Sequence, residues 1–253
     1  MSDLRSEAFT GFGGAQLSLH RLGKGRPVVL LHGLFSSAEM NWIKFGHARQ
    51  LAEAGFEVLM PDLRAHGDSA KPHDAASYPS DVLALDALAL VAHLELTDYD
   101  LVGFSMGART SVRAVLAGLR PRQLVLGGMG LAGLAGWGNR ADFFLNVIAR
   151  FGTIRPGDPA YMAQQFMKSM NVDREAVHLL LGTMADTAPA AFARIGMPTL
   201  VLCGAQDDDN GDPDALAAAL PDAIRKTIPG THMSSVTQPE MGRELVSFLT
   251  GID

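Results

Sequence analysis

The 253-residue sequence predicts an α/β fold, with a mostly parallel sheet of eight strands and helices on both of its faces. Two observations lead to this prediction. Short apolar segments with strand character alternate with longer segments of helical periodicity, an order that implies right-handed crossovers and an open sheet. The run Pro27-Val28-Val29-Leu30-Leu31 is apolar on both faces, which is typical of a central strand covered by helices on each side.

The elements follow in a regular order along the first half of the chain. Residues 7–12 and 16–22 are expected to form a hairpin, because Gly13-Gly14 between them is a hairpin turn signal. After the central strand, a helix is expected over 45–54, where Gly55 stops it. The remaining elements expected in this half are a strand at 56–61, a helix at 80–96, and strands at 99–104 and 123–126 with a helix between them.

The alternation pauses between Gly127 and about Arg194. A glycine-rich entrance leads there into three helical patterns that are rich in Phe and Met. We expect residues 131–194 to form a helical cap inserted after the sixth strand, over a core made of 1–130 and 195–253. Ordinary packing of these helices on the core is the plainer alternative. The remaining expected elements are helices at 142–151, 160–170, 174–184, 213–220 and 240–249, and strands at 198–204 and 223–228.

The stretch Gly103-Phe104-Ser105-Met106-Gly107 lies where a strand meets a helix, and this context gives the Gly-x-Ser-x-Gly pattern a chemical meaning. The two glycines remove side chains that would collide with the neighbouring strand and helix. Ser105 can therefore stand exposed at the carboxyl end of its strand, beside the unpaired N–H groups of the helix that follows. We expect Ser105 to be a nucleophile, while a plain Gly-Ser turn is the alternative for the motif taken alone.

Two other side chains are placed to activate this serine. Asp207 follows the strand at 198–204, and His232 follows the strand at 223–228. The carboxyl ends of parallel strands meet at one edge of a sheet, so distance along the chain is no obstacle to contact. A serine hydroxyl becomes a nucleophile when an imidazole takes its proton and a carboxylate orients that imidazole. The order Ser, Asp, His therefore predicts a triad of Ser105, His232 and Asp207.

Neighbouring side chains compete for these roles. Asp208 and Asp209 could each take the place of Asp207 if the loop turned differently. His32 is expected to shape a loop, and His66 is expected to be a surface or structural histidine.

Several groups of residues match a known family pattern. They are His32-Gly33, Asp62-Leu63-Arg64 with Gly67 and Ser69, Gly103 to Gly107, Gly204 to Asp207, and Pro229-Gly230-Thr231-His232. On these residues the sequence resembles the α/β-hydrolase superfamily, in its serine esterase-like branch, over essentially the whole chain.

The resemblance implies a role for each matched residue. Ser105 would be the nucleophile, His232 the general base and acid, and Asp207 the orienting carboxylate. The oxyanion hole would consist of the backbone N–H groups of Leu34 and Met106. Ala65 and Ala108 stand where the family frequently has glycine, and neither change touches the chemistry.

A serine at this position favours acyl transfer over the branches of the superfamily that use an aspartate there. We expect hydrolysis of a carboxylic ester with a small to medium, largely apolar acyl group, through an acyl-enzyme. Alternatives with the same triad are a cofactor-free perhydrolase of the haloperoxidase type, a carbon–carbon bond hydrolase, a lactonase and a thioesterase. A ligand receptor without catalysis on this fold is a further alternative.

Composition excludes several other classes of function. The net charge of −6 is mild, and no basic run suggests nucleic acid or an anionic membrane as a partner. The polar amino terminus lacks an apolar signal segment, and the single Cys203 cannot form an internal disulfide, so we expect a cytoplasmic protein. No cofactor is expected, and neither residue spacing nor the acidic loop 205–213 predicts a metal site. The expected partner is a small-molecule substrate.

Overall fold

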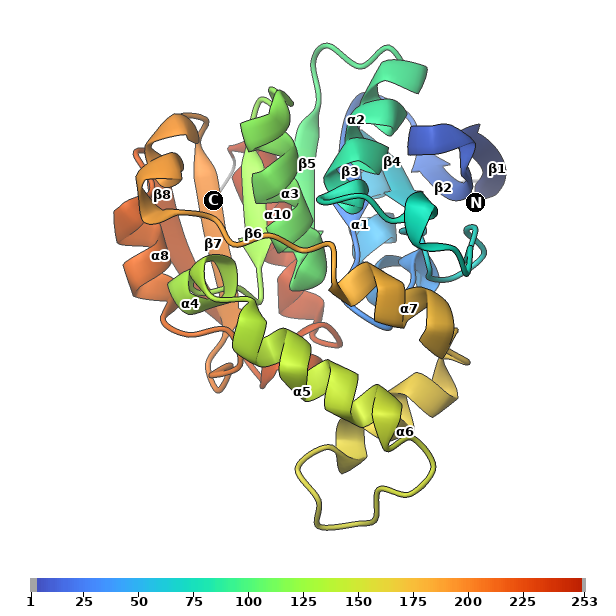
Figure 1. The fold of residues 1–253 in the computed structure, drawn as a ribbon. Coiled ribbons are helices and arrows are strands. Elements are labelled where there is room, and N and C mark those ends of the chain that lie inside the picture. The colour runs from blue at the N-terminus through green and yellow to red at the C-terminus, as the bar shows by residue number, and fades with distance from the viewer. Residues whose placement is uncertain (1–3, 252–253) are drawn as a thin grey trace.

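The computed structural model describes residues 4–251, so residues 1–3 and 252–253 of the predicted core lie outside the described part. The sheet has eight strands in the order β1-β2-β4-β3-β5-β6-β7-β8 (Figure 1). Only the pairs β1–β2 and β2–β4 are antiparallel, which confirms the predicted fold class. The strands are β1 (Arg5–Thr10), β2 (Gln16–Gly23), β3 (Arg26–Leu31), β4 (Phe56–Pro61), β5 (Asp100–Phe104), β6 (Leu124–Gly127), β7 (Thr199–Gly204) and β8 (Ala223–Ile228).

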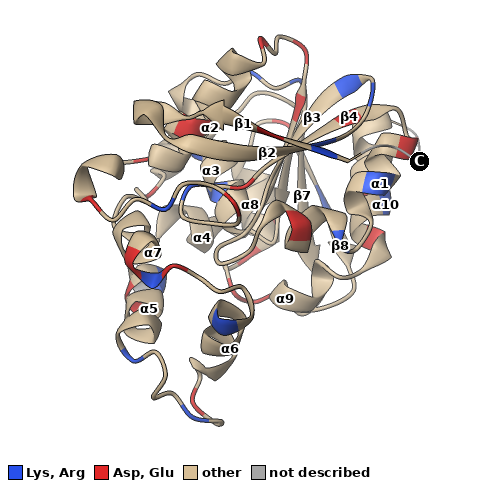
Figure 2. Ribbon diagram, turned by 90° about the vertical axis from the view of Figure 1, so that its right-hand side faces the viewer, with Lys and Arg blue, Asp and Glu red and all other residues tan. Residues whose placement is uncertain are grey.

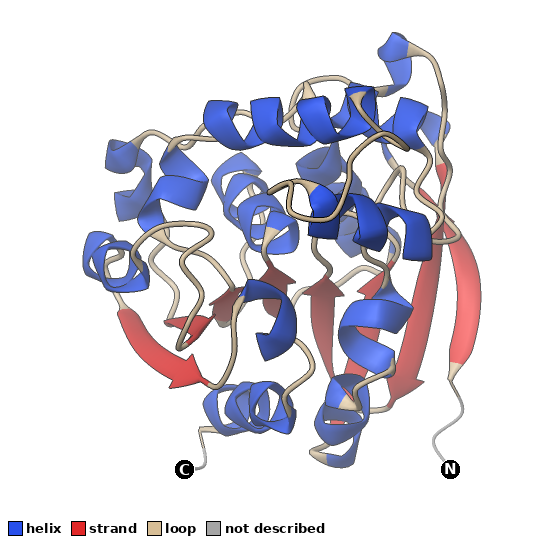
Figure 3. Ribbon diagram, turned by 90° about the horizontal axis from the view of Figure 1, so that it is seen from below, coloured by secondary structure: helices blue, strands red, loops and turns tan. Residues whose placement is uncertain are grey.

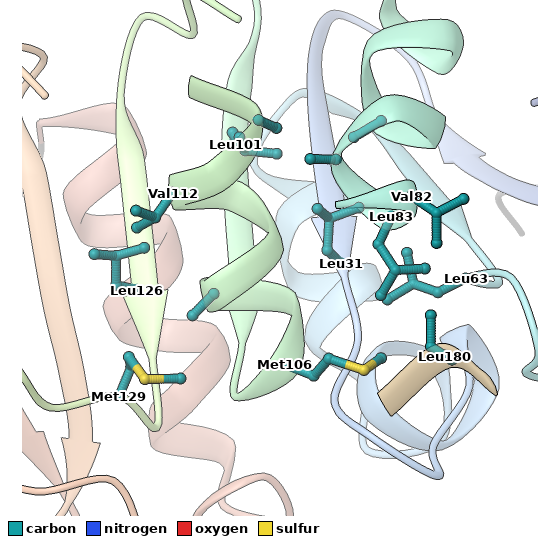
Figure 4. Packing of buried hydrophobic residues seen from close by; sticks show 14 of the residues in the cluster. Leu31, Leu63, Val82, Leu83, Leu101, Met106, Val112, Leu126, Met129 and Leu180 are labelled. Carbon is teal, nitrogen blue, oxygen red and sulfur yellow. The ribbon is translucent and has the colours of Figure 1, made fainter. Parts of the chain in front are cut away.

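Two hydrophobic cores lie on opposite faces of the sheet. Successive residues of β3 alternate between them, with Val29 and Leu31 in one core and Val28 and Leu30 in the other. The helices α2 (Val82–His93), α3 (Met106–Ala117) and α8 (Pro213–Ala219) supply the first core, and α1 (His47–Glu53) and α10 (Pro239–Thr250) supply the second. Figure 4 shows Leu31, Leu101 and Leu126 of the sheet near Val112 of α3 in the first core. The strands at the centre are buried on both sides, as their continuous apolar sequences predict.

Several helices make up most of the connection between β6 and β7. These helices are α4 (Leu131–Ala135), α5 (Gly138–Ala149), α6 (Tyr161–Ser169), α7 (Arg174–Leu181) and a 3-10 helix at Pro189–Arg194. Figure 1 shows α5, α6 and α7 grouped beyond one end of the strands, and Figure 3 shows helices on both sides of the sheet.

Arg109 of α3 ties both ends of this connection to the core. Its guanidinium donates hydrogen bonds to the carbonyl oxygens of Gly133 and Leu134 at one end, and it pairs with Asp186 at the other, 3.0 Å away. The Arg109 side chain is itself buried.

Several short elements differ from the sequence-based expectation, among them a π-helix, a four-residue helix and the start of β1. Residues Glu39–Ile43 form a π-helix before α1, so the helix expected over 45–54 begins later, at His47. His232 begins a four-residue helix, α9 (His232–Ser235), and β1 begins two residues earlier than expected. Such short segments have too few residues to show a periodicity.

No helix among residues 4–251 is both long enough and apolar enough to cross a membrane. Figure 2 shows acidic and basic residues interspersed along the ribbon in that view.

Candidate active site

Ser105 occupies a strained turn between β5 and α3. Its backbone has φ 54° and ψ −114°, a conformation that L-residues rarely adopt. A Cβ atom on Gly103 would lie 2.3 Å from the carbonyl oxygen of Gly107, and one on Gly107 would lie 2.0 Å from the carbonyl oxygen of Leu31. Both positions therefore require glycine, as expected for a serine exposed at the carboxyl end of a strand.

The structure brings the three residues of the predicted triad together. The Ser105 hydroxyl lies 2.9 Å from Nε2 of His232, and Nδ1 of His232 lies 2.9 Å from Oδ2 of Asp207. These distances fit a relay in which the serine O–H donates to the imidazole and the imidazole N–H donates to the carboxylate. His232 and Asp207 are buried, while Ser105 is partly exposed.

Local structure holds the imidazole in this place. Thr231 caps α9, because its hydroxyl accepts the N–H of Ser234 while its own N–H donates to the hydroxyl of Ser234. His232 is the first residue of this capped helix, so the cap fixes the backbone that carries the imidazole. The Phe104 ring lies beside the imidazole, with 5.2 Å between the ring centroids.

Among the three adjacent aspartates, Asp207 alone contacts His232. Asp208 is exposed, and the carboxylate of Asp209 lies 3.6 Å from the Arg140 guanidinium. The N–H of Asp209 donates to Oδ1 of Asp207 at 3.2 Å, which fixes the carboxylate with Oδ2 toward the imidazole. The geometry thus favours the first of the three positions that the sequence left open.

The loop after β3 leaves one N–H group free between two that are occupied. The N–H of Gly33 donates to Oδ1 of Asn41, and the N–H of Phe35 donates to Nε2 of His66, each at 3.0 Å. Within residues 4–251 the Leu34 N–H donates no hydrogen bond. Met106, the other predicted donor, is the first residue of α3, where the helix itself offers no acceptor for the N–H.

His32 and His66 are buried and hydrogen-bonded on both ring nitrogens. Nε2 of His32 accepts the N–H of Leu63, and its Nδ1 lies 2.8 Å from the carbonyl oxygen of Gly33. Nδ1 of His66 donates to the carbonyl oxygen of Arg64, since its Nε2 is already an acceptor. Burial lowers the pKa of both imidazoles, that of His66 to about 3, so both rings are neutral and structural. The sequence had left open whether His66 lies on the surface, and the structure buries it.

A cavity of about 190 Å³ adjoins the serine. Among the described residues, no acidic side chain and no Lys or Arg lines it, and Phe166 of α6 contributes to its wall. Met40, Asn41 and Met233 also line the cavity, although no sequence pattern marks them, because the fold sets the direction of each side chain. The lining residues are Gly33, Leu34, Ser36, Met40, Asn41, Phe45, Phe104, Ser105, Phe166, His232, Met233, Val236 and Thr237.

One group of side chains outside this cavity has the residue types of a metal site. Ligand atoms of His20, Asp62 and Asp68 lie within 4.8 Å of one another. Both Asp62 oxygens already accept backbone N–H groups, from Ala38 and Asp68, at 2.8 Å. The hydrogen bond from His20 and these N–H groups hold the pKa of Asp62 below its usual range. The carboxylate therefore serves as an acceptor that fixes two loops.

Residues 26–146 match the sequence family described as "alpha/beta hydrolase fold". The match runs from β3 into α5 and so includes the serine turn, and the sheet order described above agrees with an α/β-hydrolase fold.

Individual relatives cover most of the chain. The non-heme haloperoxidase of Rhodococcus erythropolis is 28% identical, with 95% of this chain and 98% of that protein aligned. The AB hydrolase superfamily protein YisY of Bacillus subtilis (strain 168) is 26% identical, with 76% of this chain and 78% of that protein aligned. Among solved structures, the esterase EaEST from Exiguobacterium antarcticum superimposes with a TM-score of 0.79 at 18% identity, over 96% of this chain and 98% of that one. This last likeness concerns the fold.

Proposed function

We propose that the protein is a serine hydrolase that cleaves carboxylic esters through an acyl-enzyme. The observation that carries the proposal is the pair of 2.9 Å contacts linking Ser105, His232 and Asp207 at the strained turn. Such a relay serves to remove a proton from a serine hydroxyl during attack on a carbonyl carbon. The esterase among the structural neighbours supports an ester-acting hydrolase.

In the proposed mechanism, Ser105 Oγ attacks the ester carbonyl while Nε2 of His232 takes its proton. The negative charge that forms on the carbonyl oxygen is stabilised by the N–H groups of Leu34 and Met106, each donor being worth about 3–4 kcal/mol in the transition state. His232 then protonates the leaving alcohol, which leaves an acyl group on Ser105. Water attacks this acyl group with His232 again as the base, and Asp207 stabilises the imidazolium in both steps.

The cavity supports an uncharged, largely apolar substrate of small to medium size. Its wall contains Leu34, Met40, Phe45 and Phe166, and no ionic side chain that would pair with a charged acyl group. We propose that residues 131–194 act as a cap, since Phe166 belongs to this segment and borders the cavity beside the serine.

Perhydrolysis is the second candidate. The haloperoxidase relative extends over nearly the whole chain, which favours it over the carbon–carbon, lactone and thioester alternatives. Hydrogen peroxide would then replace water in the attack on the acyl-enzyme and release a peracid. The two reactions share every residue of the first half of the mechanism.

A panel of p-nitrophenyl esters graded by acyl length, assayed with and without hydrogen peroxide, separates these functions. We expect turnover of short and medium acyl chains that is lost in Ser105→Ala and in His232→Ala, both of which stay folded by circular dichroism. Peracid formation faster than hydrolysis would favour the second candidate. Normal ester turnover in either variant would refute the proposal.

A further inference from the structure

We propose that Asn41 and His66 are positioning residues that aim the N–H of Leu34 at the substrate oxyanion. This inference rests on the proposed function, because it concerns the hydrogen-bond donor that the ester reaction requires. Neither residue belongs to the predicted triad, and the sequence alone did not connect either of them with the oxyanion hole.

The two residues hold the peptide groups on either side of the one that carries the Leu34 N–H. Oδ1 of Asn41 accepts the N–H of Gly33, and Nε2 of His66 accepts the N–H of Phe35, each at 3.0 Å. Both acceptors are buried, Asn41 at 2% exposure and His66 at 3%. With both flanking N–H groups engaged, the Leu34 N–H is the one left to face a ligand in the cavity that Leu34 and Ser105 line together.

The backbone of this loop is strained. Phe35 has φ 62°, a left-handed conformation that costs an aromatic residue about 1–2 kcal/mol. Two contacts offset this strain: the hydrogen bond to His66, and an edge-to-face contact with Phe144 of α5 at 5.3 Å between ring centroids. Without the acceptor on His66, the peptide group between Leu34 and Phe35 can rotate toward a relaxed conformation. The adjoining peptide group between Gly33 and Leu34 then turns as well, and the Leu34 N–H points away from the substrate.

The imidazole suits this task because its environment keeps it neutral. Nδ1 of His66 donates to the carbonyl oxygen of Arg64, which leaves Nε2 as the acceptor. The ring of His32 packs edge-on against it at 5.2 Å, and the Lys71 ammonium and the Asp62 carboxylate are the nearby charges. Burial and the neighbouring His32 lower the pKa of His66 to about 3, so Nε2 remains an acceptor throughout the pH range of ester hydrolysis.

Three substitutions at one position test which ring atom matters. His66→Gln places an amide oxygen near the former Nε2, whereas His66→Asn reaches only the former Nδ1, and His66→Leu offers no acceptor. We expect Leu and Asn to lower kcat roughly tenfold to 100-fold with KM changed less than about threefold, and Gln to recover most of that loss. Asn41→Leu should lower kcat in the same way.

The affinity for a trifluoromethyl ketone supplies the second readout. This inhibitor forms a tetrahedral adduct with a catalytic serine and places an oxyanion in the hole, so its Ki should rise by about the same factor as kcat falls. Leu245→Ala, in the core on the opposite face of the sheet, is the control for lost stability and should change Tm without changing kcat or Ki.

The outcomes separate this inference from the proposed function. If the wild-type protein hydrolyses esters, and kcat and Ki are the same in the wild type, His66→Gln and His66→Asn, this inference is overturned while the proposed function stands. So does a loss confined to KM or to Tm. Absence of ester turnover in the wild-type protein contradicts the proposed function, and the inference with it.

Discussion

Replacing Gly107 by alanine tests the turn on which the whole site depends. The added Cβ atom would lie 2.0 Å from the carbonyl oxygen of Leu31, 2.5 Å from its carbonyl carbon and 2.8 Å from the carbonyl oxygen of His32. All three are backbone atoms of β3 or of the residue that follows it, so no side-chain rotation can relieve the contact. The strand and α3 must separate by roughly 1 Å, which the close packing of the interior resists.

We expect Gly107→Ala to lower the free energy of unfolding by about 3 kcal/mol or more, since backbone overlap lies at the upper end of overpacking costs. In the fraction that folds, displacement of Ser105 and of the Met106 N–H should reduce kcat roughly 100-fold. Urea unfolding gives the first quantity, and p-nitrophenyl ester hydrolysis per folded molecule gives the second.

Gly196→Ala is the matched control, because a Cβ atom there meets nothing within 4 Å. It should leave both the free energy of unfolding and kcat close to the wild-type values. A Gly107→Ala protein with wild-type stability and kcat would refute the account of the turn.

Three further predictions concern single polar or ionisable side chains. Asp207→Asn should lower kcat by about four orders of magnitude, as loss of the correct imidazole tautomer does in triads, while Asp208→Asn leaves kcat near wild type; the reverse result would shift the carboxylate by one residue. Arg64→Met should cost about 3–5 kcal/mol in urea unfolding because it strands the buried Asp86 carboxylate, 2.8 Å from the guanidinium, and an unchanged transition would contradict this. Unfolding restores the pKa of His66 from about 3 toward 6.5, so its contribution to stability is complete above pH 6.5 and is lost as the pH falls toward 3. His66→Gln should therefore flatten the pH dependence of the unfolding free energy in this window by up to about 1.4 kcal/mol per pH unit, and an identical slope in both proteins would disprove it.

Both the sheet and the residues that meet at its edge could be predicted from the sequence, for the same physical reason. Ser105, Asp207 and His232 each follow an apolar strand, and parallel strands bring their carboxyl ends together whatever the length of chain between them. The helix expected from residue 213 likewise begins there as α8, where the Asp212 side chain accepts the N–H of Asp214.

Other features depend on direction in three dimensions and leave no pattern in the sequence. Oδ1 of Asn41 reaches the N–H of Gly33 because residues 39–43 form a π-helix. Five residues are too few for the sequence to show the periodicity of such a helix. His66 lies in a polar loop that the fold buries, so its sequence context suggested a surface residue as readily as a structural one. The wall of the cavity depends in the same way on which face of α6 turns toward the serine.

The proposed cap contacts two loops of the site through α5. Phe144 of α5 packs on Phe35 of the loop after β3, and Arg140 of the same helix donates a hydrogen bond to the carbonyl oxygen of Asp209. The helix thus contacts both the loop that carries the Leu34 N–H and the loop that carries Asp207. A displacement of α5 would disturb both sides of the site at once.

Covalent labelling with a fluorophosphonate, followed by peptide mapping, examines the reactivity of the serine without any assumption about the substrate. The relay between Ser105, His232 and Asp207 predicts one equivalent of label on Ser105, with the labelling rate greatly reduced in His232→Ala. Label on a different residue, or an undiminished rate in His232→Ala, would show that the imidazole does not activate this hydroxyl.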